Sequence, residues 1–183
     1  MLTLCAVLAA CSGTGSSPGS TGSSEVPVDP AEASTGSTSG PALRLARRRA
    51  EVVYVSDGDT IGVRLRGQER VRPVRLLGID TPETKDPRKP VQCFGPEASA
   101  HTKARLAPGT HVTLETDAEV HDKYGRLLAY VYVGGVRYDD ELLRLGFARL
   151  LIIPPNGVHA RAMLRAELDA RAAHRGLWGA CAG

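Results

Sequence analysis

Three short segments of the chain carry carboxylates, and two of them also carry basic side chains at close spacing: Asp57-Gly58-Asp59-Thr60, the run from Arg75 to Glu83, and Asp122-Lys123-Tyr124-Gly125-Arg126. Taken singly, each has an ordinary structural explanation as a hairpin turn, a strand exit or a polar loop. Taken together, they supply the oxygen ligands and guanidinium groups that phosphodiester chemistry requires. The combination predicts a phosphodiester-binding site.

The carboxylates of the first two segments could hold a hard cation. Asp59, Asp80 and the backbone carbonyl of Thr81 would provide oxygen ligands from two adjacent loops, as Ca²⁺ requires. Glu83 follows just outside this ligand set, where its carboxylate could orient or deprotonate an attacking water. The pattern therefore favours metal-assisted hydrolysis.

The arginines of the second and third segments complete this chemistry. Hydrolysis of a phosphodiester builds negative charge on a pentacoordinate phosphorus, and a metal with two guanidinium forks stabilises that charge. Arg75 and Arg126 are the candidates for the two forks.

Short strands and turns must position these segments. Alternation of apolar and polar residues predicts strands at 51–55, 60–65, 71–77, 111–115 and 127–133. Helices are expected from Gly95 through Leu106, over 139–145 with Gly146 as the C-cap, and from a cap at Asn156 to near Gly176. Five short strands with helices between and after them indicate an α+β fold, a small closed barrel with helices at its ends.

The same segments, in this order and spacing, resemble the staphylococcal-type thermonuclease family. The likeness runs from about Val52 to Trp178 and rests on Asp57-Gly58-Asp59-Thr60, Arg75-Leu76-Leu77, Asp80-Thr81-Pro82-Glu83-Thr84-Lys85, Gly95-Pro96-Glu97-Ala98 and Tyr124-Gly125-Arg126. It implies a five-stranded OB-fold β-barrel with about three helices. It also implies Ca²⁺-dependent hydrolysis of DNA and RNA with little sequence specificity, leaving 3′-phosphate ends.

The resemblance assigns a role to each matching position. Asp59 and Asp80 match the carboxylate ligands of calcium, Thr81 matches its carbonyl ligand, and Asp57 matches a nearby acid outside the ligand set. Glu83 matches the residue assigned to water activation, Arg75 the arginine that binds the scissile phosphate, and Arg126 the arginine that stabilises the transition state and leaving group. Lys123 and Tyr124 match residues that touch a terminal phosphate.

One segment departs from the family pattern. The family's type member has a pair of tyrosines in the loop before the last helix, where they line the nucleotide pocket. Here the corresponding residues are Leu151-Ile152-Ile153-Pro154-Pro155, and the segment is one residue shorter. We expect weaker affinity or a changed preference for the substrate, with the chemistry retained.

The first residues of the chain are typical of an export signal. Leu2 to Ala10 are nearly all apolar and about as long as the h-region of a signal peptide. They end at Leu8-Ala9-Ala10-Cys11, which resembles the lipobox of bacterial lipoproteins, so residues 1–10 are predicted to be a lipoprotein signal peptide and Cys11 the lipidated residue. A buried N-terminal strand is the alternative. The usual positive n-region charge is missing after Met1, which leaves the start codon open.

A polar linker follows the predicted lipidation site. Residues 11–40 are rich in Ser, Gly, Thr and Pro, a composition that cannot bury enough apolar area to fold. We therefore expect a disordered tether that holds a folded thermonuclease-like domain, residues 41–183, away from a membrane anchor. The predicted location is the cell envelope, as an exported and membrane-anchored lipoprotein, or the medium after secretion. No protein partner is predicted.

Charge is distributed unevenly along the chain. The formal net charge is +3, but every Lys and Arg follows Gly40 while three acidic residues precede it, so the remainder carries 23 basic and 17 acidic residues, or +6. A basic domain favours polyanions such as nucleic acid or an anionic membrane. Arg44 and Arg47 to Arg49 fit either a membrane-binding patch or a solvated lead-in to the first strand. No segment has the roughly 20 apolar residues that a membrane-spanning helix needs.

Two cysteines fall in the predicted domain. Cys5 lies in the apolar segment and Cys11 in the lipobox, which leaves Cys93 and Cys181. In an exported protein, two thiols in one small domain are most simply a disulfide, with free thiols as the alternative. Metal binding would require further Cys or His residues at short spacing.

Two other classes of function compete with a nuclease. An OB-type barrel can bind single strands without cutting them, and a surface lipoprotein can bind envelope polymers through charge alone. The first alternative is disfavoured because every acidic and basic position of the site is retained. The second gives no reason for Asp59, Asp80 and Glu83 to accompany Arg75 and Arg126.

Overall fold

The computed structural model describes residues 46–88 and 90–181. The predicted signal peptide, Cys11, the linker and Arg44 lie outside the described residues. Among the described helices, none is long and apolar enough to cross a membrane.

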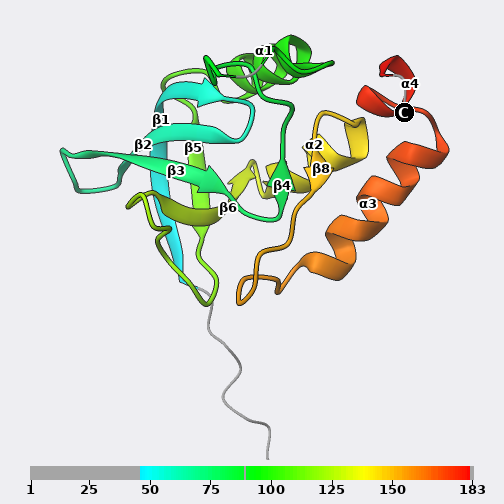
Figure 1. Cartoon of the computed structure of the whole chain (residues 1–183). Coiled ribbons are helices and arrows are strands. Elements are labelled where there is room, and N and C mark those ends of the chain that lie inside the picture. The colour runs from blue at the N-terminus through cyan, green and yellow to red at the C-terminus, as the bar shows by residue number, and fades with distance from the viewer. Residues whose placement is uncertain (1–45, 89, 182–183) are drawn as a thin grey trace, which may run out of the picture. The chain divides into compact units, whose positions relative to one another are not determined.

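Five strands form a closed barrel in the order β3-β2-β1-β5-β6. They are β1 (Arg47–Asp57), β2 (Thr60–Leu65), β3 (Val71–Leu76), β5 (His111–Glu115) and β6 (Leu127–Val133). Neighbours in this order pair antiparallel, and the parallel pairing of β3 with β6 closes the barrel, so these five strands leave no open edge. Figure 1 shows β1, β2 and β3 side by side, and β7 (Val136–Arg137) extends the sheet beyond β6.

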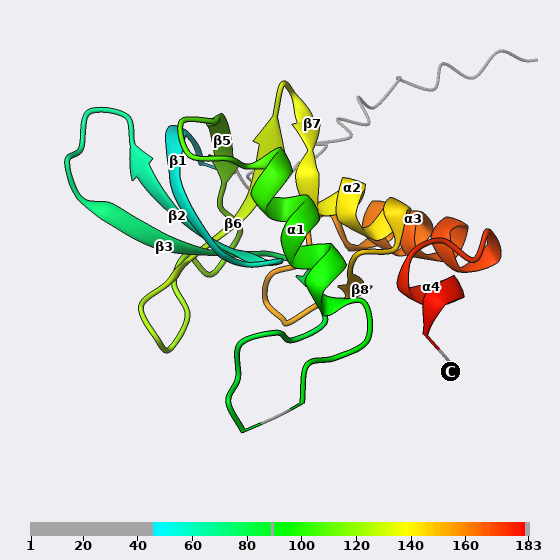
Figure 2. The same ribbon diagram turned by 90° about the horizontal axis from the view of Figure 1, so that it is seen from above.

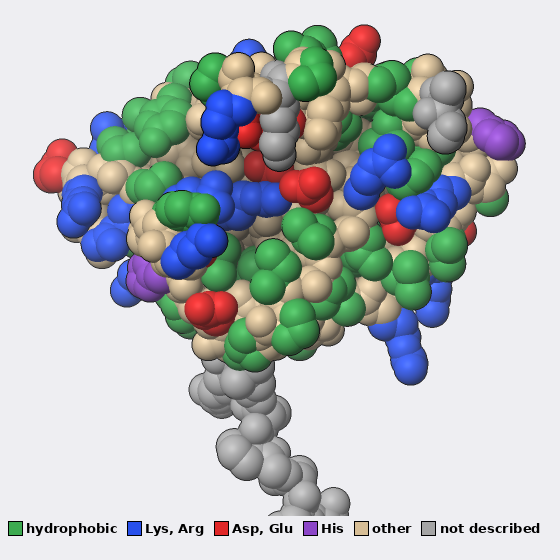
Figure 3. Space-filling model, in the orientation of Figure 1, with side chains coloured by type: hydrophobic (Ala, Val, Ile, Leu, Met, Phe, Trp, Pro, Cys, Tyr) green, Lys and Arg blue, Asp and Glu red, His purple; other side chains and the backbone are tan. Residues whose placement is uncertain are grey.

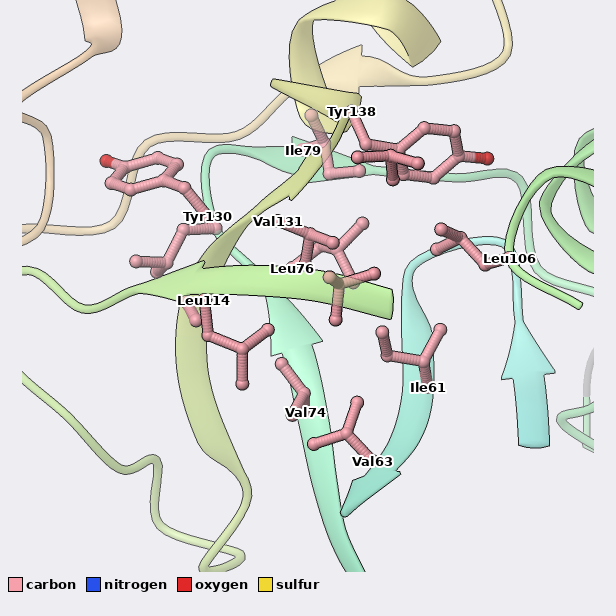
Figure 4. Packing of buried hydrophobic residues seen from close by; sticks show 14 of the residues in the cluster. Ile61, Val63, Val74, Leu76, Ile79, Leu106, Leu114, Tyr130, Val131 and Tyr138 are labelled. Carbon is pink, nitrogen blue, oxygen red and sulfur yellow. The ribbon is translucent and has the colours of Figure 1, made fainter. Parts of the chain in front are cut away.

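Alternating residues of the strands fill the barrel. Ile61 and Val63 of β2 are fully buried, as is Val74 of β3, and Figure 4 shows their side chains pointing toward one another in the interior. The residues between them therefore face outward. Burying each large apolar side chain contributes roughly 1.5–3 kcal/mol, so this apolar interior is the main source of the barrel's stability.

Helices cover the ends of the barrel. They are α1 (Gly95–Arg105), α2 (Tyr138–Leu145), α3 (Ala160–Ala172) and the single turn α4 (Leu177–Ala180). In Figure 2, α1 lies across the barrel while α2 and α3 lie together beside it, and α2 contacts α3. A small second sheet pairs β4 (Ile79–Asp80) with β8 (Arg149–Leu150). The prediction of an OB-fold barrel with about three helices is confirmed for the described residues, with β4, β7, β8 and α4 in addition.

The predicted cap of the last helix is wrong. Asn156 precedes α3 by four residues and is buried, and its side chain accepts a hydrogen bond from the Glu119 amide (2.7 Å) and donates one to the Glu119 carbonyl (3.0 Å). A loop more than thirty residues away thus takes the side chain that local spacing assigned to the helix. The predicted C-cap of α2 is confirmed, since Gly146 is left-handed with φ 75°.

The basic lead-in belongs to the first strand. Arg47 to Arg49 pair with β5, so β1 begins four residues earlier than predicted. The predicted disulfide is also present: Cys93, just before α1, is bonded to Cys181, just after α4.

Candidate active site

A pocket of about 630 Å³ opens where the β1–β2 turn, the end of β3, β4 and two loops meet. Its lining residues are Ser56, Asp57, Asp59, Thr60, Arg75, Asp80, Thr81, Glu83, Lys85, Asp86, Pro87, Arg88, Gln92 and Arg126. The structure therefore gathers the three chemistry-bearing segments of the sequence around one space. Figure 3 shows basic and acidic side chains side by side over β3 and β4.

Arg75 lies at the centre of this pocket. Its Nη2 is 3.2 Å from Asp59 Oδ2 and 3.1 Å from Asp80 Oδ1, so two carboxylates from different loops meet at one nitrogen. Its Nη1 donates to the carbonyls of Leu76 (3.0 Å) and Ile79 (2.9 Å). The guanidinium is thus held by groups on both of its terminal nitrogens, and its side chain is only 15% exposed.

Asp59 is fixed by the loop that carries Asp80. Its Oδ2 accepts hydrogen bonds from the amide of Thr81 (3.2 Å) and from its hydroxyl (3.1 Å), and its Oδ1 accepts one from Thr60 (3.0 Å). Thr81 also packs against Gly58, where an added methyl group would lie 2.7 Å from the Thr81 hydroxyl oxygen. Glycine at this turn lets the two loops approach closely.

Glu83 is held as an anion by its own turn. Its Oε1 accepts hydrogen bonds from the amides of Lys85 (2.7 Å), Thr84 (2.9 Å) and Asp86 (3.1 Å). These hydrogen bonds, of which the one from the Lys85 amide has the largest effect, lower the pKa of Glu83, although partial burial opposes them. Asp57 fastens the same turn, because its Oδ1 accepts a 2.9 Å hydrogen bond from the Thr84 hydroxyl.

Arg126 enters the pocket from the loop between β5 and β6. Its Nε donates to Asp122 Oδ2 (2.7 Å), and Asp122 Oδ1 accepts from the amides of Tyr124 and Arg126, both at 2.9 Å. Burial alone would raise the pKa of Asp122, but these hydrogen bonds lower it. Gly125 has φ 77° in this tight turn, a conformation that suits glycine. Asp122 therefore positions Arg126 and remains charged.

Lys123 and Tyr124 lie beside the pocket and do not line it. Tyr124 is 72% exposed, with Lys123 Nζ 5.1 Å and the Arg126 guanidinium 5.5 Å from its ring centre. The two residues form an exposed aromatic and basic rim next to Arg126.

Sequence reasoning missed part of the pocket wall. Arg88 forms a bidentate ion pair with Asp86, with Nε 2.9 Å from Oδ1 and Nη2 3.0 Å from Oδ2. Gln92 joins the two ends of this loop. Its side-chain Oε1 accepts a hydrogen bond from the Glu83 backbone amide (2.9 Å), and its backbone amide donates one to the Glu83 carbonyl (3.0 Å). The charged run directly after Glu83 was the available signal for Arg88. Nothing in the local sequence indicated Gln92.

The segment that departs from the family pattern does not line this pocket. None of the residues from Leu151 to Pro155 lines it, and Ile153 is 63% exposed. The lining described above contains no aromatic side chain. A nucleotide base would therefore find no ring to stack on inside this pocket.

The donors around Arg75 suit a hard cation. Asp59 and Asp80 present oxygen atoms alone, and no group of three or more His, Cys, Asp or Glu residues that could hold a metal occurs in residues 46–88 and 90–181. Two carboxylates that already converge on one cationic nitrogen would need backbone or water oxygens to complete a calcium shell. The donor set is therefore compatible with Ca²⁺ bound by few protein ligands.

Comparison with known proteins agrees with this geometry. A family model described as Staphylococcal nuclease homologue matches residues 73–180. The chain belongs to the staphylococcal nuclease family. The thermonuclease of Staphylococcus intermedius is 42% identical over 127 residues, which cover 69% of this chain and 74% of that protein.

Two further relatives extend the family relationship. The thermonuclease of Staphylococcus hyicus is 38% identical over 128 residues, 70% of this chain and 74% of that protein. Endonuclease YncB of Bacillus subtilis (strain 168) is 40% identical over 124 residues, 67% of this chain and 57% of that protein. The family resemblance expected from the motifs is confirmed.

Proposed function

We propose that this chain is a Ca²⁺-dependent phosphodiesterase that hydrolyses DNA and RNA with little sequence specificity. Membership of the staphylococcal nuclease family supports a nuclease, as do relatives named thermonuclease and endonuclease. The observation that carries the proposal is the meeting of Asp59 and Asp80 at one nitrogen of Arg75, in a pocket that Arg126 also lines.

Arg75 and Arg126 are the proposed phosphate-binding groups. A guanidinium presents a rigid fork of donors that matches two phosphate oxygens, and both arginines are oriented before substrate arrives. Because their positions are fixed by backbone carbonyls and by Asp122, little reorganisation accompanies the build-up of charge on the phosphate. Arg75 would bind the scissile phosphate and Arg126 the leaving oxygen.

Glu83 would place the attacking water. Three turn amides keep its carboxylate ionised and in one orientation, so it accepts a proton of that water as a hydrogen bond. Because three amides fix this carboxylate in its turn, it can hold the water in one orientation.

Asp59, Asp80 and the carbonyl of Thr81 are the proposed ligands of calcium. When bound, the cation would supply positive charge next to the phosphate and polarise its oxygens. Asp57 lies outside this ligand set and orients the Glu83 turn through Thr84.

The other features of the substrate follow from the same groups. Contacts from guanidinium groups to phosphate carry no base information, which agrees with weak sequence preference. Lys123 and Tyr124, on the rim next to Arg126, would touch a terminal phosphate. The 3′-phosphate products are proposed from the family resemblance.

We also propose that the enzyme is an exported lipoprotein, anchored through Cys11 in the cell envelope or released. The apolar segment, the lipobox and the polar linker of the sequence support this proposal.

Digestion of DNA and RNA by the purified full chain tests the activity. We expect cleavage of both with Ca²⁺, strongly reduced cleavage with Mg²⁺, none in chelator, and 3′-phosphate ends on the products. Full rates in chelator would contradict calcium dependence, and the absence of cleavage with every divalent ion would contradict a nuclease.

A further inference from the structure

An exposed tyrosine packs closely against a strand next to the proposed active site. The ring of Tyr54 in β1 covers Gly62 in β2 so closely that a methyl group on Gly62 would lie 2.1 Å from Tyr54 Cε1 and 2.3 Å from Cζ. Glycine inside a strand often marks such a close approach. Gly62 is buried beneath the ring, yet Tyr54 remains 44% exposed. One surface of the ring is therefore supported and the remainder faces solvent.

The strand register places this ring on the outer surface of the barrel. Ile61 and Val63, on either side of Gly62, point into the interior in Figure 4, so position 62 faces outward. Gly62 pairs with Pro73 of β3, and two residues along the same strands Thr60 pairs with Arg75. Because a strand rises about 3.3 Å per residue, the Tyr54 platform lies about 7 Å along the strands from the Thr60–Arg75 row of the active site.

A second pocket is lined by residues farther along β1 and β2, beyond the Tyr54–Gly62 pair. It has a volume of about 760 Å³, and its lining includes Arg64, Arg66 and Arg49 with Glu51 and Glu69. Arg64 faces outward two residues beyond Gly62, and its Nη1 is 4.0 Å from Glu51 Oε1, too far for a hydrogen bond. Along the paired strands, Arg75 therefore lies on one side of the Gly62–Pro73 row and Arg64 on the other, with Arg66 in the turn that follows β2.

This arrangement matches the parts from which single-strand binding surfaces are built. Such surfaces combine basic groups that follow the phosphate chain with aromatic rings that stack the bases. The active-site pocket has the basic groups but no aromatic side chain in its lining. Tyr54 supplies a ring on the adjacent surface.

We propose that Tyr54 is a base-stacking platform for a single-stranded nucleic acid whose scissile phosphate lies at Arg75 and whose chain continues toward Arg64 and Arg66. The proposal rests on the proposed nuclease function. It assigns a base contact to β1 and β2, and not to the loop from Leu151 to Pro155.

Two substrates of different length test the platform separately from the chemistry. A p-nitrophenyl phosphodiester of a single nucleotide reaches only the active-site pocket, whereas a single-stranded oligonucleotide also covers Tyr54. In Tyr54→Ala we expect kcat/KM to stay unchanged for the small ester and to fall about tenfold for the oligonucleotide. Equal kcat/KM values for wild type and variant on the oligonucleotide would overturn the platform. Failure of wild type to cleave either substrate would instead overturn the proposed function.

Two substitutions separate stacking from a structural role. Tyr54→Phe keeps the ring, so oligonucleotide cleavage should match wild type. Tyr54→Leu keeps an apolar cover on Gly62 but has no aromatic face, so it should lose as much as Tyr54→Ala. Thermal unfolding of each variant checks the fold. Activity that tracks unfolding temperature, or full activity in Tyr54→Leu, would overturn stacking.

Binding of a cleavage-resistant phosphorothioate oligonucleotide tests the contact without turnover. Removing the stacked base, by scanning an abasic site along the oligonucleotide, should weaken wild-type binding about tenfold at one position and leave Tyr54→Ala unaffected there. Replacing both Arg64 and Arg66 with Ala should reduce the slope of log Kd against log salt concentration by about 1.4, because each phosphate contact to a single strand contributes about 0.7. Equal abasic effects in both proteins would overturn the platform, and an unchanged slope would overturn the path toward the second pocket.

Discussion

Two clusters of basic side chains and carboxylates in this protein, one around Arg75 and the other around Glu115, differ in how far their polar atoms are exposed to solvent. Glu115 is 1% exposed; its Oε2 contacts Arg47, and its Oε1 lies 2.6 Å from His159 Nε2 and 3.2 Å from the Tyr132 hydroxyl. Both of its oxygens are used within the fold. Around Arg75, the Asp80 side chain is 55% exposed and lines an open pocket.

The difference separates a structural cluster from a binding site. The Glu115 cluster connects β1, β5, β6 and the residue that precedes α3, so its hydrogen bonds hold the barrel to the C-terminal helix. Breaking a buried charge pair leaves an unpaired ion and costs stability. The Arg75 cluster presents similar groups in an open pocket, where the proposed substrate would reach them. Substitutions in the two clusters should therefore affect different measurements.

The largest effect is expected at the arginines of the active site. Arg75→Lys and Arg126→Lys should each lower kcat by about 10²–10³-fold or more, because Lys lacks the planar fork that binds two phosphate oxygens. Arg75→Lys also loses hydrogen bonds to the Leu76 and Ile79 carbonyls, so thermal unfolding checks that each variant is folded at the temperature of the rate measurement. Arg144→Lys, at an exposed position of α2, is the matched control and should keep full turnover. Near-normal rates in either active-site variant would contradict the assignment.

Removal of the disulfide should be the largest structural effect. Cys93 and Cys181 are 88 residues apart, and a cross-link over so long a loop stabilises a protein by about 2–4 kcal/mol. Cys93→Ser/Cys181→Ser should lower the free energy of unfolding by that amount in denaturant titrations. Reduced wild type should behave like the variant, and non-reduced wild type should resist thiol labelling. Two labelled thiols without reductant would refute the disulfide.

Glu115→Gln should destabilise the fold by about 2 kcal/mol and leave kcat intact, because the substitution removes the charge that Arg47 pairs with. Burial raises the pKa of Glu115, but hydrogen bonds from His159 and Arg47 outweigh it and lower the folded-state pKa. Its stabilisation is therefore present above the unfolded pKa of about 4.3 and lost as pH falls through the folded pKa. Acid titrations should show this loss in wild type and in the exposed control Glu119→Gln, and not in Glu115→Gln.

Asp139 should give a pH dependence of opposite sign. It is fully buried in α2, where its Oδ2 accepts a 2.8 Å hydrogen bond from the Val131 amide, and burial raises its pKa to about 8. An unfolded Asp ionises near pH 4, so this residue costs stability increasingly between about pH 4 and pH 8. Asp139→Asn keeps the acceptor without the charge, and its stability gain over wild type should grow across that range. A gain independent of pH would contradict the raised pKa.

The smallest effect on chemistry is expected at Cys11. Cys11→Ser should abolish lipid modification and leave the protein unprocessed or shed, while nuclease activity of the chain stays unchanged, because the proposed site lies entirely within the described residues. Cell fractionation with activity assays checks both parts. Wild-type protein found wholly in the cytosol, from Met1 or a longer start, would refute the lipoprotein proposal and leave the enzymatic one standing.

The sequence alone predicted the five barrel strands, three of the helices and the segments that line the pocket. Alternating apolar and polar residues identified the five barrel strands, because a strand with one buried face places an apolar residue on that face at every second position. Elimination of Cys5 and Cys11 identified the pairing of Cys93 with Cys181. The three charged segments identified the pocket and the family, because each is a short motif whose residue types and spacing can be read directly from the sequence.

Tertiary structure decided other long-range contacts and the atoms that make them. The closing of β3 on β6, the meeting of Asp59 and Asp80 at Arg75, and the use of Asn156 by a distant loop all join residues far apart in the chain. Tyr54 reaches Gly62 only because the register of β1 on β2 shifts between Val52 and Tyr54. Such contacts depend on strand register and loop closure. A local sequence pattern does not predict these, because it reports only which face of its own strand or helix is buried.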